Sequence, residues 1–130
     1  MQGNMKVILF TTLLLFSING FAFNWVEVAE DPKGDTFYID IDNIKKHKGL
    51  VYYWELVDYL KPLGDEVYSH LVKWKVDCGE EKRNGLTVTT YDQSMGKGKI
   101  LGEWNPNKTY HPRPNTVGHS TMKFACDNAK

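Results

Sequence analysis

Apolar and polar side chains alternate along most of the chain after residue 23, which is the pattern of strands with one buried face. Aromatic and β-branched residues, which favour strands, are concentrated in the same stretches. Turn residues such as Asp31–Gly34 and Pro62–Asp65 separate them. The pattern predicts six strands, over residues 24–30, 36–40, 50–61, 67–78, 86–91 and 99–104.

Three other segments lack this alternation. Asp40–Lys46 offers carboxylates suited to capping, which favours a short helical turn over a pair of acid–base groups. Asn105–Asn115 contains three prolines and is predicted as an extended loop outside the sheet. Thr116–Asn128 has the spacing of a helix, with Asn115 or Thr116 as its N-cap. This helix is weak by itself, so we expect it to dock on the sheet in an α+β domain.

The first residues follow the pattern of a secretory signal peptide. One lysine precedes an apolar run over residues 7–16, which is too short to span a bilayer comfortably. Gly20 and Ala22 are small residues at the positions that signal peptidase requires. We therefore expect a cleavable signal over residues 1–22 and a single exported domain over 23–130, without a stable membrane span. An uncleaved anchor is the alternative, and the polar residues within the apolar run count against it.

Both cysteines lie on the apolar faces of their predicted elements. Cys78 shares its strand face with Trp74 and Val76, and Cys126 falls on the apolar arc of the predicted helix. Export places the two thiols in an oxidising compartment, where an even pair is most simply one disulfide. The sequence thus predicts a Cys78–Cys126 bridge that pins the helix to the sheet.

Charge and motif content argue against several classes of function. Sixteen basic and sixteen acidic residues balance, so the chain lacks the positive charge typical of nucleic-acid binding. The four histidines are scattered without the spacing of paired metal ligands, and the sequence has no nucleophile elbow or phosphate-binding loop. We predict no metal site, no cofactor and no enzymatic activity.

Three exposed features are candidates for binding a protein partner. They are a charged turn over residues 80–83, the tip of a hairpin over residues 97–99, and the stiff aromatic segment over residues 110–114. Cations in turns also serve to discourage pairing between sheet edges, and the third segment also suits a rigid tether before the helix. The candidate partner-binding residues are Lys82, Arg83, Lys97, Lys99, Tyr110 and Arg113.

Aromatic residues suggest a different class of function. We expect Tyr52, Trp54, Tyr68 and Trp74 either to belong to the core or to line a groove where the helix meets the sheet. A groove of this kind suits a periplasmic carrier of a small molecule or lipid.

Short sequence blocks spread over nearly the whole mature chain match a known pattern. They are Trp25-Val26, Phe37–Asp40 with Ile44, Val51–Trp54, the pair Tyr59 and Pro62, Ser69–Lys73, Asp77-Cys78, Met95-Gly96, Trp104 and Pro114–Cys126. Together these blocks resemble the surface-adhesin protein E-like domain family of Gram-negative bacteria. The resemblance implies a curved, six-stranded antiparallel sheet with a C-terminal helix tied to its concave face by a disulfide.

The same resemblance implies binding rather than catalysis. The family's named member captures host proteins such as vitronectin, laminin and plasminogen. No cysteine follows the apolar run of the signal, so a lipobox is missing, and we expect the product in the periplasm or at the surface without a lipid anchor. Pairing through sheet edges, in a homodimer or an envelope assembly, is a further alternative.

Overall fold

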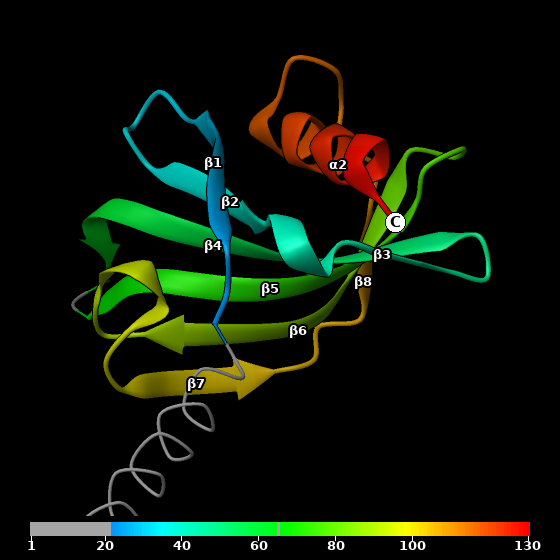
Figure 1. The fold of residues 1–130 in the computed structure, drawn as a ribbon. Helices are drawn as coiled ribbons and strands as arrows, with labels where there is room; N and C mark the ends of the chain where they lie inside the picture. The colour runs from blue at the N-terminus through cyan, green and yellow to red at the C-terminus, as the bar shows by residue number, and fades with distance from the viewer. Residues whose placement is uncertain (1–21, 65) are drawn as a thin grey trace, which may run out of the picture.

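The computed structural model describes residues 22–64 and 66–130, and the signal segment predicted over residues 1–22 lies outside this range except for Ala22. Eight strands form one antiparallel sheet in the order β1-β2-β4-β5-β6-β7, with β3 beside β4 and β8 beside β6 (Figure 1). The strands are β1 (Trp25–Glu30), β2 (Thr36–Asp40), β3 (Lys45–His47), β4 (Leu50–Leu63), β5 (Val67–Asp77), β6 (Lys82–Tyr91), β7 (Ile100–Trp104) and β8 (Lys108–Tyr110). The helical elements are the short 3₁₀ turns η2 (Ile41–Asn43) and η3 (Ser94–Gly96) and the α-helix α2 (Val117–Asn128).

The predicted α+β class, the antiparallel sheet and the C-terminal helix are confirmed, but the sheet has eight strands instead of about six. The helical turn expected at Asp40–Lys46 covers only η2, in which the side chain of Asp40 accepts the backbone N–H of Asp42. Residues 45–47 pair with β4 instead. Lys108–Tyr110 forms a strand within the proline-rich loop, because Pro106 and Pro112 flank it and leave its own N–H groups free to pair.

Strand β6 begins four residues earlier than the alternation predicted. Asp77 pairs directly with Lys82, so the turn between β5 and β6 is short and holds only residues 78–81. Lys73 pairs with Thr87 and Trp74 pairs with Gly85, so Leu86 is an extra residue in β6. This bulge interrupts the alternation of side chains, and the sequence pattern therefore predicted only the part of the strand that follows it.

The two faces of the sheet have different environments. The helix face lies under α2, on the concave side of the sheet, and carries the core residues Val51, Tyr53, Val72, Trp74 and Val76 (Figure 1). The opposite face, called the open face here, carries Tyr52, Trp54, Lys73 and Lys75, because each of these alternates with a core residue. The expectation of one shared aromatic groove is therefore wrong for Tyr52 and Trp54, which lie on the opposite face from Trp74.

Helix α2 is capped at its start and held to the sheet near its end. The side chain of Thr116 accepts the N–H of His119, which confirms the predicted N-cap. Thr121, Met122 and Ala125 are buried against the sheet. Beyond the helix, the backbone of Lys130 accepts the N–H of Lys46 in β3 and donates to the carbonyl of Ile44, which precedes β3.

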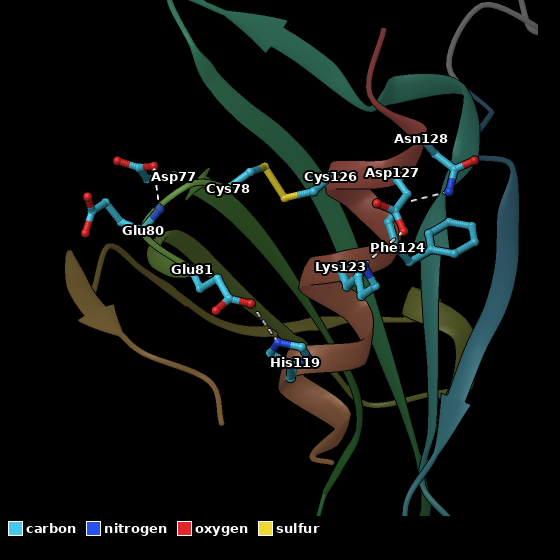
Figure 2. Close-up of a disulfide and its surroundings, with 10 residues drawn as sticks. All are labelled: Asp77, Cys78, Glu80, Glu81, His119, Lys123, Phe124, Cys126, Asp127 and Asn128. Atoms are coloured by element: carbon cyan, nitrogen blue, oxygen red, sulfur yellow. Dashed lines mark hydrogen bonds and ion pairs between the residues drawn. A yellow bond between two sulfur atoms is a disulfide. The ribbon is translucent and has the colours of Figure 1, made fainter. Parts of the chain in front are cut away.

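The predicted Cys78–Cys126 disulfide is present, with the two Cα atoms 6.0 Å apart. Figure 2 shows a second link between the same two segments, since His119 Nε2 on α2 lies 3.0 Å from Glu81 Oε1. The turn between β5 and β6 is thus joined to α2 by one covalent bond and one polar contact.

The outer strands of the sheet are irregular. The β1–β2 register shifts between Glu27 and Ala29, and the β6–β7 register shifts between Thr90 and Tyr91. Bulges of this kind interrupt the row of free backbone groups that a second chain would need for pairing. In the described part of the chain, no helix is long and apolar enough to cross a membrane.

Candidate functional site

A buried polar cluster lies beneath α2 at the centre of the helix face. Arg83 Nη1 donates to Tyr53 Oη at 2.7 Å, to Thr121 Oγ1 at 3.1 Å and to Glu55 Oε1 at 3.4 Å. The guanidinium also lies 3.9 Å from the ring centre of Trp74, whose indole N–H donates to Glu55 Oε2 at 3.3 Å. These contacts join β4, β5, β6 and α2 through one ionic group.

Electrostatics in this cluster favour a permanently charged arginine beside a neutral tyrosine. Burial raises the pKa of the Tyr53 phenol far above its ordinary value, and the negative charge of Glu55 adds to the effect. Burial by itself would lower the pKa of Arg83, but Glu55 and Tyr53 outweigh it and the net shift is upward. Arg83 is therefore a structural cation that compensates the buried Glu55.

Next to this cluster, the helix face opens into an apolar groove that α2 leaves uncovered. Its volume is about 430 Å³, and apolar and aromatic side chains from β4 to β8 form most of its lining. A second hollow of about 350 Å³ shares Trp74 and Tyr110 with it and extends the groove toward the start of α2. We call this continuous surface the helix-side groove; its principal residues are Tyr59, His70, Val72, Trp74, Val88, Trp104, Tyr110, Pro112 and Arg113.

The floor of the helix-side groove is polar but uncharged at neutral pH. Burial raises the pKa of Tyr59 to about 12, with the charges of Asp35 and Asp31 adding to it. Burial also lowers the pKa of His70, against an opposing effect of Glu55. The Tyr59 hydroxyl and His70 Nδ1 lie 2.5 Å apart, so the neutral phenol and the neutral imidazole share a hydrogen bond.

This histidine makes stability fall on acidification. The unfolded chain binds a proton at His70 near pH 6.5, whereas the folded chain binds it only at lower pH. The free energy of unfolding should therefore decrease progressively as the pH drops below 6.5. Urea unfolding at neutral pH and at about pH 5 measures this decrease. His70→Gln should reduce the dependence of the free energy of unfolding on pH, whereas the control His111→Gln, at an exposed histidine, should leave it unchanged. An equal dependence on pH in the wild-type protein and both variants would contradict the assignment of this effect to His70.

The six predicted partner-binding residues do not form one patch. Tyr110 and Arg113 border the helix-side groove. Lys82 is exposed at the start of β6, while Lys97 and Lys99 are exposed beyond the other end of the same strand. Whether these lysines bind a partner stays a prediction.

Arg83 is the clear correction among the six. It was expected in an exposed turn, but it is only 9% exposed because β6 begins at Lys82 and places the next residue on the helix face. Counting alternate residues back from Val88 assigns Arg83 to the helix face only when the extra residue at Leu86 is taken into account, and the sequence does not reveal that residue as extra.

Segment Tyr110–Pro114 combines the two roles that the sequence left open. The Tyr110 ring packs edge-on against Trp74, with ring centres 5.9 Å apart, and remains 42% exposed. The Arg113 carbonyl accepts the hydroxyl of the N-cap residue Thr116 at 2.6 Å, which fixes the segment to the helix. The segment is thus both a tether for α2 and a wall of the groove.

Trp104 is the functional candidate that sequence reasoning missed. It closes the outer side of the groove at the end of β7, opposite Val88, and is 49% exposed. Its strand was predicted, but the face that Trp104 occupies was not. A register shift in β7 places Trp104 on the helix face and Ile100 on the open face, and the alternation of side chains gives no sign of this shift.

Comparison with known proteins identifies the group to which this architecture belongs. The family model described as surface-adhesin protein E matches residues 25–127, nearly the whole described domain. The chain belongs to the surface-adhesin protein E family. No curated protein matches it significantly.

Solved structures agree on the fold. One crystal form of Haemophilus influenzae protein E superposes with a TM-score of 0.60 at 17% identity, covering 83% of this chain and 91% of that one. Protein E from non-typeable Haemophilus influenzae superposes with a TM-score of 0.54 at 19% identity, covering 82% and 86%. The family is one of surface adhesins, which are exported proteins.

Proposed function

We propose that this member of the surface-adhesin protein E family is an exported, non-enzymatic binding protein that captures a host extracellular protein through the helix-side groove. The observation that carries the proposal is the groove itself, an open aromatic surface placed on a rigid, cross-linked scaffold. Family membership supplies the class of partner, and vitronectin, laminin and plasminogen are the candidates to test.

The composition of the groove suits a protein partner. Tryptophan, tyrosine and arginine are the residues that contribute most to binding energy in protein interfaces, and Trp104, Tyr110 and Arg113 supply one of each. The Tyr110 ring is already held by Trp74, so little conformational entropy of this side chain is lost when a partner side chain packs against it. Arg113 at the rim can pair with an acidic residue of the partner.

Replacing Trp104 and Tyr110, the two exposed aromatic residues that border the groove, should weaken binding to the host protein strongly. The double variant Trp104→Ser/Tyr110→Ser removes two partly exposed rings of the groove and leaves every buried core residue unchanged, although Trp74 loses its edge-on contact with Tyr110. We expect its Kd for immobilised vitronectin to rise about thirtyfold, equivalent to roughly 2 kcal/mol. Laminin and plasminogen are measured in parallel by surface plasmon resonance.

Ile100→Ser provides the matched control. Ile100 lies on the same strand as Trp104 and is 53% exposed, but it pairs with Tyr91 on the open face. It should leave binding unchanged. Equal losses in both variants would reject the groove, and wild-type protein that binds none of the three host proteins would reject the adhesin function. Labelling of intact cells with a membrane-impermeant reagent tests exposure at the surface.

A carrier of a small amphipathic molecule is the second candidate function. The paired hydroxyl and imidazole of Tyr59 and His70 give the apolar groove a neutral hydrogen-bonding group on its floor, which a purely protein-binding surface does not need. Native mass spectrometry of protein purified from the periplasm should then show a bound ligand. A uniformly empty protein would remove this candidate.

A further inference from the structure

The open face of the sheet carries a group of cations that the helix-side groove does not use. Lys45 on β3, Tyr52 on β4 and Lys75 on β5 lie in one row, because they are direct partners in adjacent strands. Lys73 lies two residues from Lys75 on the same strand and pairs with Trp54. We call this surface the cationic strip; it consists of Lys45, Lys73, Lys75 and Lys82 with the aromatic rings of Tyr52 and Trp54.

The lysines of the cationic strip form no close ion pairs. Within residues 22–64 and 66–130, none of its four lysines has a carboxylate oxygen within 4.0 Å. One carboxylate shares the face: Asp77 is the cross-strand partner of Lys82 and accepts the backbone N–H of Glu80 at 3.1 Å, so the positive charge is greatest at Lys45, Lys73 and Lys75. Because the whole chain has no formal net charge, these cations are a local feature and not a property of the protein at large.

The geometry of the strip suits repeated, well-separated negative charges. Lys73 and Lys75 are about 7 Å apart along the strand, and Lys45 and Lys75 are about 10 Å apart across two strand spacings. Two shallow hollows of about 360 and 320 Å³ flank this row. Amide and hydroxyl groups of Asn43, Asn84 and Thr109 line them and can hydrogen-bond to neutral hydroxyl groups of a ligand.

The aromatic rings of the strip distinguish between two kinds of polyanion. Lys73 Nζ lies over the Trp54 ring, 5.3 Å from its centre, and Phe23 packs edge-on against the same ring at 6.2 Å. The His47 ring lies 6.5 Å from that of Tyr52. Nucleic-acid bases need open aromatic faces for stacking, and these faces are partly occupied. Pairing of sulfates with ammonium groups needs no such stacking.

We propose that the cationic strip is a second binding site, independent of the helix-side groove, for a sulfated linear polysaccharide of the heparin type. The lysine ammonium groups pair with sulfates, and the polar groups of the hollows receive sugar hydroxyls. The cation–π contact holds the Lys73 ammonium near the site before the ligand arrives, which reduces the entropy lost on binding.

The test uses a short heparin oligosaccharide and isothermal titration calorimetry. Lys73→Gln/Lys75→Gln should weaken binding about tenfold and reduce its dependence on salt concentration. Lys97→Gln/Lys99→Gln is the matched control, since it removes the same charge from two exposed lysines beyond the other end of β6, and its Kd should be unchanged. Trp104→Ser/Tyr110→Ser should also bind heparin normally, which separates this site from the groove.

Several outcomes would overturn the proposal. They are absence of binding by the wild-type protein, equal weakening in both lysine pairs, and equal affinity for a desulfated oligosaccharide. Tighter binding of single-stranded poly-dT would assign the strip to nucleic acid instead. Should the Lys73/Lys75 variant fail to fold, amide chemical shifts of the wild-type protein decide: heparin must perturb β3, β4 and β5 at the strip, and perturbation confined to Lys97–Lys99 would contradict the site.

Discussion

Removal of the disulfide by Cys78→Ser/Cys126→Ser is expected to lower the free energy of unfolding by about 4 kcal/mol. The bridge joins residues 48 positions apart, and opening this loop restores a large conformational entropy to the unfolded chain. In a domain of this size the melting temperature should fall by on the order of 15 °C. Urea unfolding followed by circular dichroism measures both quantities.

The loss should be concentrated in α2. This helix has few strong helix-forming residues and fully buries only Thr121, Met122 and Ala125. Without the bridge it is held by this packing, by the hydrogen bond from Arg83 to Thr121 and by the weaker contact between His119 and Glu81. Hydrogen exchange in residues 117–128 should accelerate more than in β4 and β5. His119→Ala is the control for the second link and should cost well under 1 kcal/mol, since the contact is exposed. A double serine variant as stable as the wild-type protein would show that the bridge is dispensable.

Arg83→Met is expected to destabilise the domain by roughly 3–5 kcal/mol. The substitution leaves Glu55 as a buried carboxylate without its cation and removes donors from Tyr53 and Thr121. It also removes the guanidinium from the Trp74 ring, so that near-ultraviolet circular dichroism of this tryptophan should change.

The companion variant separates an unpaired charge from lost packing. Replacing both partners in Glu55→Met/Arg83→Met eliminates the buried carboxylate, so the double variant should recover much of the stability that the single variant loses. Chemical denaturation of the two single variants and the double variant forms a complete cycle. A double variant that is less stable than Arg83→Met would show that the ion pair does not control this region.

The alternation of side chains was sufficient to predict the long strands, because β4 and β5 keep strict periodicity over the residues that bury Val51, Tyr53, Trp74 and Val76. The same parity placed Cys78 on the apolar face of its strand, and helical spacing placed Cys126 on the apolar side of the helix. Together with the expected export, these positions predicted the bond that the structure contains. The capping residue of α2 was equally readable, because Thr116 is a good N-cap before an apolar periodic run.

The features that sequence reasoning missed depend on tertiary contacts. Strands β3 and β8 contain three residues each, which is too few to show a period, and they exist because β4 and β6 offer free edges. Arg83 lies inside because Glu55, 28 positions away, compensates its charge. The lining of the helix-side groove depends on single extra residues, Leu86 in β6 and Leu101 in β7, which change the faces on which the neighbouring side chains lie. No local sequence pattern predicts these two bulges.

The assignment of binding to the helix-side groove is tested most directly by hydrogen–deuterium exchange of the wild-type protein with and without vitronectin. Our account predicts new protection at the end of β7, in β8 and in residues 110–116, which border the groove. Protection confined to Lys97–Lys99 or to the cationic strip, with the groove segments exchanging as in the free protein, would contradict it.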